Sequence, residues 1–225
     1  MKVIGLTDIH GRADFLVEIS YELKEADLVL VSGDITHFGR REDAYSVVQK
    51  IQNLNTRVFA VHGNCDYPEV GFYLEEAGLN LHRNCVPFEE HILAGIGGSL
   101  PCPGKTPNEH SEEEFNRYLE QLKKEIHPSP PLIFVSHQPP LDTICDFASS
   151  GFHVGSQSIR DFILEVQPLV CFTGHIHEGV GIDFIANTAV VNPGPLHFKG
   201  YTVLDIGDKI KDLKLMKGRK IVESL

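Results

Sequence analysis

The first 65 residues alternate short apolar runs with amphipathic segments, and this alternation constrains the fold more than any other feature of the chain. Residues 2–7, 27–33 and 57–63 are apolar runs of strand length. Between them, residues 13–26 and 41–54 place apolar side chains at helical spacing, which predicts helices with one buried face. A strand–helix order of this kind predicts parallel strands covered by helices on both faces.

The rest of the chain continues with alternating elements. Strands are predicted over residues 91–98, 132–137 and 169–175, and helices over residues 111–127 and 156–167. Ser111 and Glu114 are spaced as a capping box at the start of the first of these helices. The last fifty residues alternate like antiparallel strands. Because no linker divides the chain, we predict one domain over residues 1–225.

Charge and cysteine content narrow the classes of partner. The formal net charge of −11 argues against a broad basic face for duplex nucleic acid or an anionic membrane, but a small anionic substrate stays compatible if bound cations change the charge of a cleft. The chain has five cysteines, no C-x-x-C pair, no secretory apolar region and no run near the roughly 18 apolar residues of a membrane span. These features predict a reduced, cytoplasmic protein, and nothing in the sequence indicates its oligomeric state.

Five predicted strands are followed directly by polar side chains of metal-binding type. Ligands of α/β sheets bind beyond the carboxyl ends of the strands, so these side chains are expected to meet there. They are Asp8, His10, Asp34, Asn64, Asp66, His137, His175 and His177. The set is too large for one tetrahedral zinc ion, which takes about four ligands. Two divalent ions about 3.5–4 Å apart would use it, and such pairs clamp phosphate oxygens and turn a bridging water into hydroxide.

The order of these motifs resembles that of the calcineurin-like metallophosphoesterase family. The motifs are D-x-H at 8–10, G-D at 33–34, G-N-x-D at 63–66, a lone His at 137 and G-H-x-H at 174–177. The resemblance implies an α/β fold of central mixed β-sheets with outer helices. It also implies a first metal held by Asp8, His10 and His177, a second held by Asn64, His137 and His175, and Asp34 as the bridging ligand.

One position departs from the pattern commonest in that family. Many members have His after the Asn of G-N-x-D, where it is thought to protonate the leaving oxygen, whereas this chain has Cys65. A thiol is a poorer proton donor than an imidazolium near neutral pH, because its pKa starts near 8.5. Cys65 is therefore either a small residue packed near the metals or a chemical participant, and His153 or His197 is a candidate replacement acid. Relatives with the same G-N-C-D resemble phosphodiesterases.

The sequence thus predicts a dinuclear metal-dependent hydrolase of small phosphodiesters that uses a metal-bridging hydroxide. Its expected catalytic residues are Asp34, Asn64, Cys65 and Asp66, and its expected ions are Mn, Fe, Zn or Ni, with Mn favoured. A phosphomonoesterase, a nuclease or a non-catalytic metal-binding scaffold remain as alternatives. Arg40 and Arg41, just past Asp34, are either phosphate contacts or solvated residues at a helix start.

Overall fold

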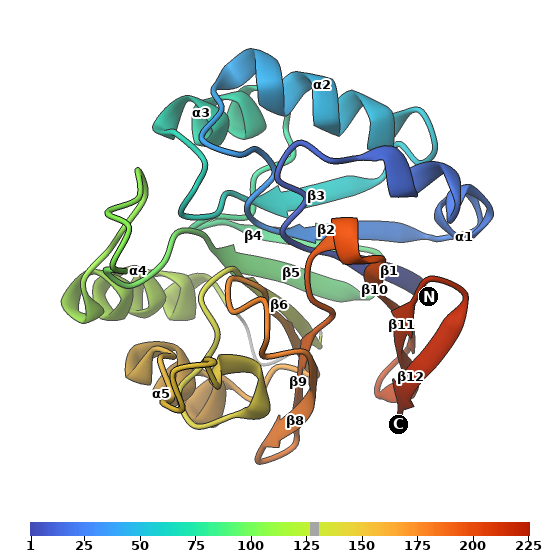
Figure 1. The fold of residues 1–225 in the computed structure, drawn as a ribbon. Helices are drawn as coiled ribbons and strands as arrows, with labels where there is room; N and C mark the ends of the chain where they lie inside the picture. Colours follow the sequence, from blue (N-terminus) through green and yellow to red (C-terminus); the bar gives the residue numbers. More distant parts are fainter. Residues whose placement is uncertain (127–130) are drawn as a thin grey trace.

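The computed structural model describes residues 1–126 and 131–225, and its centre is a pair of six-stranded β-sheets (Figure 1). The first sheet has the order β12–β11–β10–β1–β2–β3 and the second the order β4–β5–β6–β7–β9–β8. The strands of the first sheet are β1 (Lys2–Leu6), β2 (Leu28–Ser32), β3 (Val58–Val61), β10 (Gly200–Ile206), β11 (Ile210–Lys217) and β12 (Lys220–Ser224). Those of the second are β4 (Cys85–Phe88), β5 (His91–Ile96), β6 (Leu132–Ser136), β7 (Val170–Phe172), β8 (Gly181–Ile185) and β9 (Thr188–Asn192).

The helices lie on the outside of this pair of sheets (Figure 1). The first sheet is covered by α1 (Ser20–Lys24), α2 (Arg41–Gln52) and α3 (Pro68–Glu76), and the second by α4 (Glu112–Glu125) and α5 (Gln157–Val166). This arrangement confirms the predicted fold class of mixed sheets flanked by helices.

The prediction that helices cover both faces of the first parallel strands was wrong, because the inner face of that sheet packs against the second sheet. Alternate residues of β2 show this: Val29 and Val31 belong to the core under the helices, whereas Leu28 and Leu30 belong to the core between the sheets. A buried strand has the same apolar composition whether a helix or another sheet covers it, so the sequence alone did not separate the two cases.

Most predicted elements are present, with shifted bounds. The segment predicted as one helix over 13–26 is a 3₁₀ turn at Asp14–Val17 followed by the short α1. Its predicted apolar face is still buried, namely Phe15, Leu16, Ile19 and Leu23. The capping box of α4 is confirmed, because the Ser111 hydroxyl accepts a hydrogen bond from the Glu114 amide at 3.2 Å and the Glu114 carboxylate accepts one from the Ser111 amide at 2.9 Å. Residue 127, the predicted last residue of that helix, lies outside the described residues.

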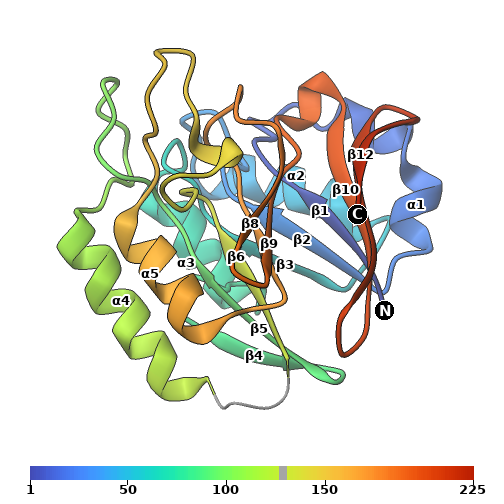
Figure 2. The ribbon, with the colours of Figure 1, turned by 90° about the horizontal axis from the view of Figure 1, so that it is seen from below.

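The C-terminal strands pair antiparallel as predicted, except that β9 is parallel to β7. The neighbours β1, β2 and β3 are parallel, as are β5, β6 and β7. Figure 2 shows long loops near residues 100 and 150 projecting together at one end of the molecule. Parallel strands therefore deliver the residues that follow them to one edge of the sandwich.

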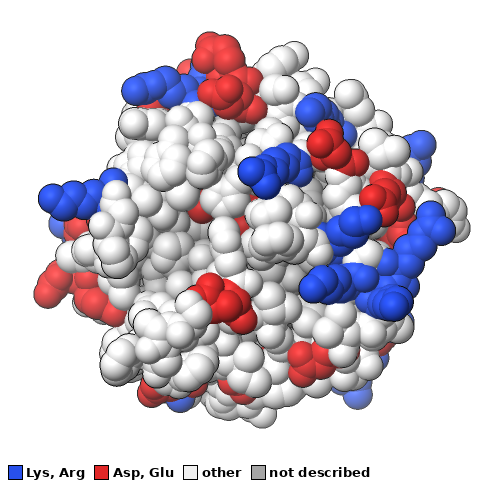
Figure 3. All heavy atoms as spheres, in the orientation of Figure 1, with Lys and Arg blue, Asp and Glu red and all other residues white. Residues whose placement is uncertain are grey.

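Two broader features bear on partners. In the described part of the chain, no helix combines the length and apolar character needed to cross a membrane. On the face of the molecule in Figure 3, charged side chains lie mainly around the margin, and Lys and Arg gather over β10–β12 with acidic side chains among them. The middle of this face is largely uncharged.

Candidate metal centre

Side chains from both sheets converge at the carboxyl ends of five strands. The first sheet supplies Asp8 and His10 after β1, Asp34 after β2 and Asn64 after β3. The second supplies His137 after β6, and His175 and His177 after β7. The cluster therefore spans the junction between the two sheets, and its members come together only because the sheets pack face to face.

Asp8, His10 and His177 form the first group of this cluster. His177 Nε2 lies 3.3 Å from Asp8 Oδ1 and 3.3 Å from His10 Nε2. One ligand atom from each of the three residues lies within 4.8 Å of the others, which is close enough for a shared ion. Asp8 Oδ1 is buried and accepts no hydrogen bond from the described residues. A buried carboxylate oxygen without a donor is unfavourable unless a cation contacts it.

His137, Asn64 and His175 form the second group. His137 Nε2 lies 2.9 Å from Asn64 Oδ1, and the rings of His137 and His175 have centroids 5.2 Å apart. The His175 amide donates to Asp8 Oδ2 at 3.2 Å, which joins this group to the first. The side chain of His137 thus lies beside both Asn64 and His175.

Asp34 lies between the two groups. Its Oδ2 is 3.6 Å from His10 Nε2, while its Oδ1 is 3.5 Å from His137 Nε2 and accepts a hydrogen bond from the Cys65 amide at 2.8 Å. One carboxylate therefore faces a member of each group with a different oxygen. This is the position that a bridging ligand needs.

The hydrogen bonding of His137 shows why the centre fits cations. Its Nδ1 is 2.7 Å from the Ser32 carbonyl oxygen, so Nδ1 carries a hydrogen and donates it. In the neutral ring Nε2 then has only a lone pair, yet it faces the oxygens of Asn64 and Asp34. Three acceptors that face one another require a positive charge between them, either a proton or a metal ion.

Burial sets the protonation of the centre. It raises the pKa of Asp34 to about 7, with the charges of Asp66 and Asp8 adding to the effect. Burial also acts to raise the pKa of Asp8, but the adjacent imidazoles of His177, His137 and His10 lower it overall. Burial lowers the pKa of His10 to about 4 and that of His175 to about 3. Neutral imidazoles and buried carboxylates are the donor set that divalent transition metals use.

The backbone of the centre is strained. Asp8, His10, Asp34 and His175 have φ of 49°, 48°, 47° and 67°, in the left-handed region that non-glycine residues rarely adopt. Residues held in this region cost free energy and persist where function needs their geometry. Gly174 is required for a different reason, because a Cβ there would lie 1.9 Å from Thr7 Oγ1 and 2.6 Å from Asp8 Oδ2.

Asp66 does not face the cluster with a free oxygen. Its buried carboxylate accepts hydrogen bonds from the Ile35 amide (3.1 Å), the Thr36 amide (2.8 Å), the Thr36 hydroxyl (2.7 Å) and the Gly63 amide (2.8 Å). These donors belong to the loops that follow β2 and β3. Asp66 therefore ties together the two loops that carry Asp34 and Asn64.

The Cys65 thiol does face the cluster, since its Sγ lies within 4.8 Å of ligand atoms of His10 and Asp34. Burial, and next the negative charge of Asp34, raise the pKa of Cys65 well above its ordinary value, so the thiol is a poor acid.

The two candidate replacement acids are His153 and His197. His153 pairs with Asp146 in its own loop, with 2.7 Å between His153 Nδ1 and Asp146 Oδ1. The charges of Arg12 and His177 contribute, after burial, to lowering the pKa of His197.

His37 is a neighbour of the centre that sequence reasoning missed. Its exposed ring packs edge-on against the ring of His10, with the centroids 5.5 Å apart. It lies three residues beyond Asp34, where no strand end or repeated spacing marked it. The G-D motif followed by an imidazole in the same loop was the available signal.

One loop and two arginines lie near the ligand cluster. The loop over residues 99–110 borders the centre, because Thr106 Oγ1 accepts a hydrogen bond from Asn64 Nδ2 at 3.1 Å. Arg40 forms an ion pair with Glu69, and Arg41 forms one with Glu76 at 2.6 Å. The two arginines are thus engaged with acidic residues of α3.

A sandwich of two mixed sheets whose strand ends deliver a buried histidine–carboxylate cluster has the architecture of a metal-dependent hydrolase. A family model described as "Calcineurin-like phosphoesterase" matches residues 1–179. The chain therefore belongs to the calcineurin-like phosphoesterase family, as the sequence motifs predicted.

Individual proteins share the sequence or the fold of this chain. The chain is 41% identical over 212 residues to Uncharacterized protein MJ1162 of Methanocaldococcus jannaschii, and the match covers 91% of this chain and 92% of the relative. The crystal structure of TT1561 of Thermus thermophilus has the same fold, with a TM-score of 0.76, 18% identity and coverage of 97% of this chain and 99% of that chain. A dimetal phosphatase from Danio rerio matches with a TM-score of 0.64, 14% identity and coverage of 100% and 98%.

Proposed function

We propose that this chain is a dinuclear metal-dependent phosphoesterase, organised as one domain over residues 1–225, that prefers small phosphodiesters. The observation that carries the proposal is the position of Asp34, whose two oxygens face His10 and His137 in separate ligand groups. Asp8, His10 and His177 would hold one cation, and Asn64, His137 and His175 the other. Two divalent cations there would supply the positive charge that polarises a phosphate and activates water for hydrolysis.

The chain's own residues prepare this centre. Ser32 accepts the Nδ1 hydrogen of His137 and so directs the Nε2 lone pair of that ring toward the cations. The hydroxyl of Thr7 and the amide of His175 hold one oxygen of Asp8, which leaves the other oxygen for ligation. Asp66 acts as a positioning residue through its four hydrogen bonds, in place of the catalytic role that its motif suggested.

The proton donors and charges around the centre support a diester substrate. The Cys65 thiol occupies the position of the family's imidazole and has a raised pKa, so it does not favour protonation of a poor leaving group. Arg40 and Arg41 are engaged with Glu69 and Glu76, which leaves less positive charge for the dianion of a monoester. We assign the role of proton donor to His37, because its exposed ring lies against His10 at the surface of the cluster.

The identity of the ions and the compartment are also part of the proposal. Imidazole, carboxylate and amide ligands suit Mn, Fe, Zn or Ni, and the carboxylate and amide oxygens among them favour Mn for assays. All five cysteines are unpaired, which supports activity in the reducing cytoplasm.

The test compares a diester with its monoester. Purified protein, loaded in turn with Mn²⁺, Fe²⁺, Zn²⁺ and Ni²⁺, is assayed with bis-p-nitrophenyl phosphate and with p-nitrophenyl phosphate. We expect faster turnover of the diester and loss of turnover in Asp34→Asn, which keeps the shape of the side chain but removes its charge. Faster turnover of the monoester would overturn the diester preference. No turnover of either ester with any of the ions would favour a binding scaffold.

A further inference from the structure

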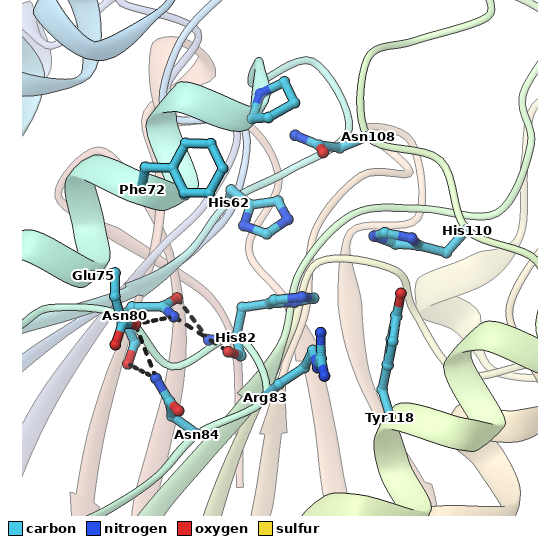
Figure 4. A pocket seen from close by; sticks show the side chains of 12 residues that line it. His62, Phe72, Glu75, Asn80, His82, Arg83, Asn84, Asn108, His110 and Tyr118 are labelled. Carbon is cyan, nitrogen blue, oxygen red and sulfur yellow. Dashed lines mark hydrogen bonds between the residues drawn. The ribbon is translucent and has the colours of Figure 1, made fainter.

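A second cavity lies beside the metal centre, where the chain crosses from the first sheet to the second. Its volume is about 500 Å³, and its walls come from α3, residues 80–84, residues 108–110 and α4 (Figure 4). Pockets of this size hold small organic ligands. None of the seven proposed metal ligands lines it, so it is separate from the centre described above.

Three imidazoles, those of His62, His82 and His110, line this cavity. His62 is 7% exposed, and both its Nδ1 and the Nε2 of His110 are buried in the cavity wall, where they face Gly71 and Gly98. His82 Nδ1 accepts a hydrogen bond from the Gly97 amide at 2.8 Å, so in the neutral ring its Nε2 carries the hydrogen. Burial lowers the pKa of His62 to about 3 and also lowers that of His110, so these rings are uncharged hydrogen-bonding groups.

The other groups of the cavity add aromatic faces and one cation. Figure 4 shows Arg83 directed toward the space between His82 and Tyr118, and its guanidinium carbon lies 4.5 Å from the centroid of the Tyr118 ring. Phe72 is 66% exposed on the opposite wall, beside His62. A single carboxylate, that of Glu75, lies at the far end from Tyr118 and accepts hydrogen bonds from two asparagine amides.

These groups select a class of ligand. The three imidazoles do not form a group with ligand atoms close enough to share a metal ion in the part of the chain that the structure describes. Exposed aromatic faces beside uncharged imidazole rings suit a planar nitrogen heterocycle, and the guanidinium of Arg83 suits one anionic substituent. We propose that this cavity is a second ligand site, which binds a nucleotide-like molecule: a nitrogen heterocycle that carries a single phosphate.

The cavity is connected to the metal centre through Asn108. The Asn108 amide donates to the Asn64 carbonyl oxygen at 3.1 Å, and its side chain donates to the carbonyl oxygen of Asp66. A ligand that contacts Asn108 therefore acts on the loop that presents Asn64 to the cations. This contact makes the site regulatory: its ligand changes the affinity of the protein for the second cation, and the cation changes the affinity for the ligand by the same factor.

The first experiment measures binding directly, without relying on catalysis. The full-length protein is titrated calorimetrically with AMP, GMP, CMP and UMP, and with adenosine and inorganic phosphate as partial probes, first as purified and then with EDTA. We expect at least one nucleotide to bind with a Kd between about 10 μM and 1 mM in both conditions, and each partial probe to bind at least tenfold more weakly. Absence of binding up to about 5 mM, or binding that EDTA abolishes, would overturn the proposal.

Gly71→Leu changes the cavity wall beside His62. A Cβ at Gly71 would lie 3.3 Å from His62 Nδ1, so a side chain there displaces the His62 ring at the cavity wall by a few tenths of an ångström. Gly71 lies inside α3, where glycine is a poor helix former and leucine a good one. Glu76→Leu places the same side chain on the same helix outside the cavity and serves as the matched control.

We expect Gly71→Leu, checked by circular dichroism to be folded, to weaken nucleotide binding more than tenfold, and Glu76→Leu to bind normally. Arg83→Gln should weaken nucleotide binding about tenfold but leave adenosine binding unchanged, because it removes the partner of the phosphate. Nucleotide binding that survives Gly71→Leu in folded protein would place the ligand elsewhere. Because these readouts need neither metal nor turnover, they stand even if the phosphoesterase proposal fails.

Discussion

Substitution of Asp66 is the clearest way to distinguish a positioning role of this residue from a catalytic role. Asp66→Ala deprives four donors of their acceptor: the amides of Ile35, Thr36 and Gly63, and the Thr36 hydroxyl. A buried donor without a partner costs about 1–3 kcal/mol. If water entering the space serves two of the four, the free energy of unfolding falls by about 4 kcal/mol. For a chain of this size, that loss lowers Tm by roughly 8–16 °C.

The assay is urea unfolding followed by circular dichroism, in EDTA and again with Mn²⁺, beside kcat measurements on the same preparations. The free energy of unfolding of Asp66→Asn should lie between those of Asp66→Ala and the wild type. The Asn side chain keeps one acceptor oxygen, but its amide group faces hydrogen-bond donors. Asp27→Ala is the control: this half-exposed carboxylate holds the Lys2 amide and Arg57, so its loss should cost less than about 1 kcal/mol. If Asp66→Ala abolished turnover but left stability within about 1 kcal/mol of the wild type, the positioning role would be refuted.

Three further predictions concern the centre itself. Removal of metal with EDTA should abolish turnover and lower Tm, and Mn²⁺ should restore both; turnover that persists in chelator with no metal detected by elemental analysis would contradict the proposed centre. His37→Ala should slow hydrolysis of diesters with alkyl leaving groups at least about tenfold, yet change bis-p-nitrophenyl phosphate turnover little, because only the alkyl alkoxide needs a proton. Equal effects on both substrates would remove His37 from the mechanism. In metal-free protein, the pKa of Asp34 near 7 lies above its ordinary 3.8, so the native state keeps a proton that the unfolded state releases between those pH values. Its contribution to stability is therefore lost as pH rises through about 7, and urea unfolding should show wild type losing stability relative to Asp34→Asn over that range.

Much of the fold was predictable because its strands are buried and its helices amphipathic. Apolar runs that end abruptly on Asp8, Asp34 and His137 marked both the strands and the centre. Where the local pattern is weaker, the prediction was incomplete. The helix α3 was missed because Gly71 interrupts its apolar pattern, and β4 because Pro87 lies inside a four-residue strand.

Other properties of the centre depend on tertiary structure. The left-handed conformation of Asp8 and His10 arises from hydrogen bonds between their loop and the loop after β2. The hydrogen bonds that Asp66 accepts from the amides of Ile35 and Thr36 likewise join two loops that are about thirty residues apart in sequence. No spacing rule reports such contacts, so the sequence indicated which residues meet but not which of them keep a free oxygen.

The division of the ligands between the sheets has a mechanical consequence. Four of the seven proposed ligands follow strands of the first sheet, and three follow strands of the second. Ions bound there would link the two sheets at this edge of the sandwich. Loss of the ions would let the two sheets separate locally at that edge more often. The strands β2 and β6 are in contact between the two sheets, so their amide hydrogens should exchange faster in chelator. The exchange rates of the amide hydrogens of β11, which lies far from this contact, should change little.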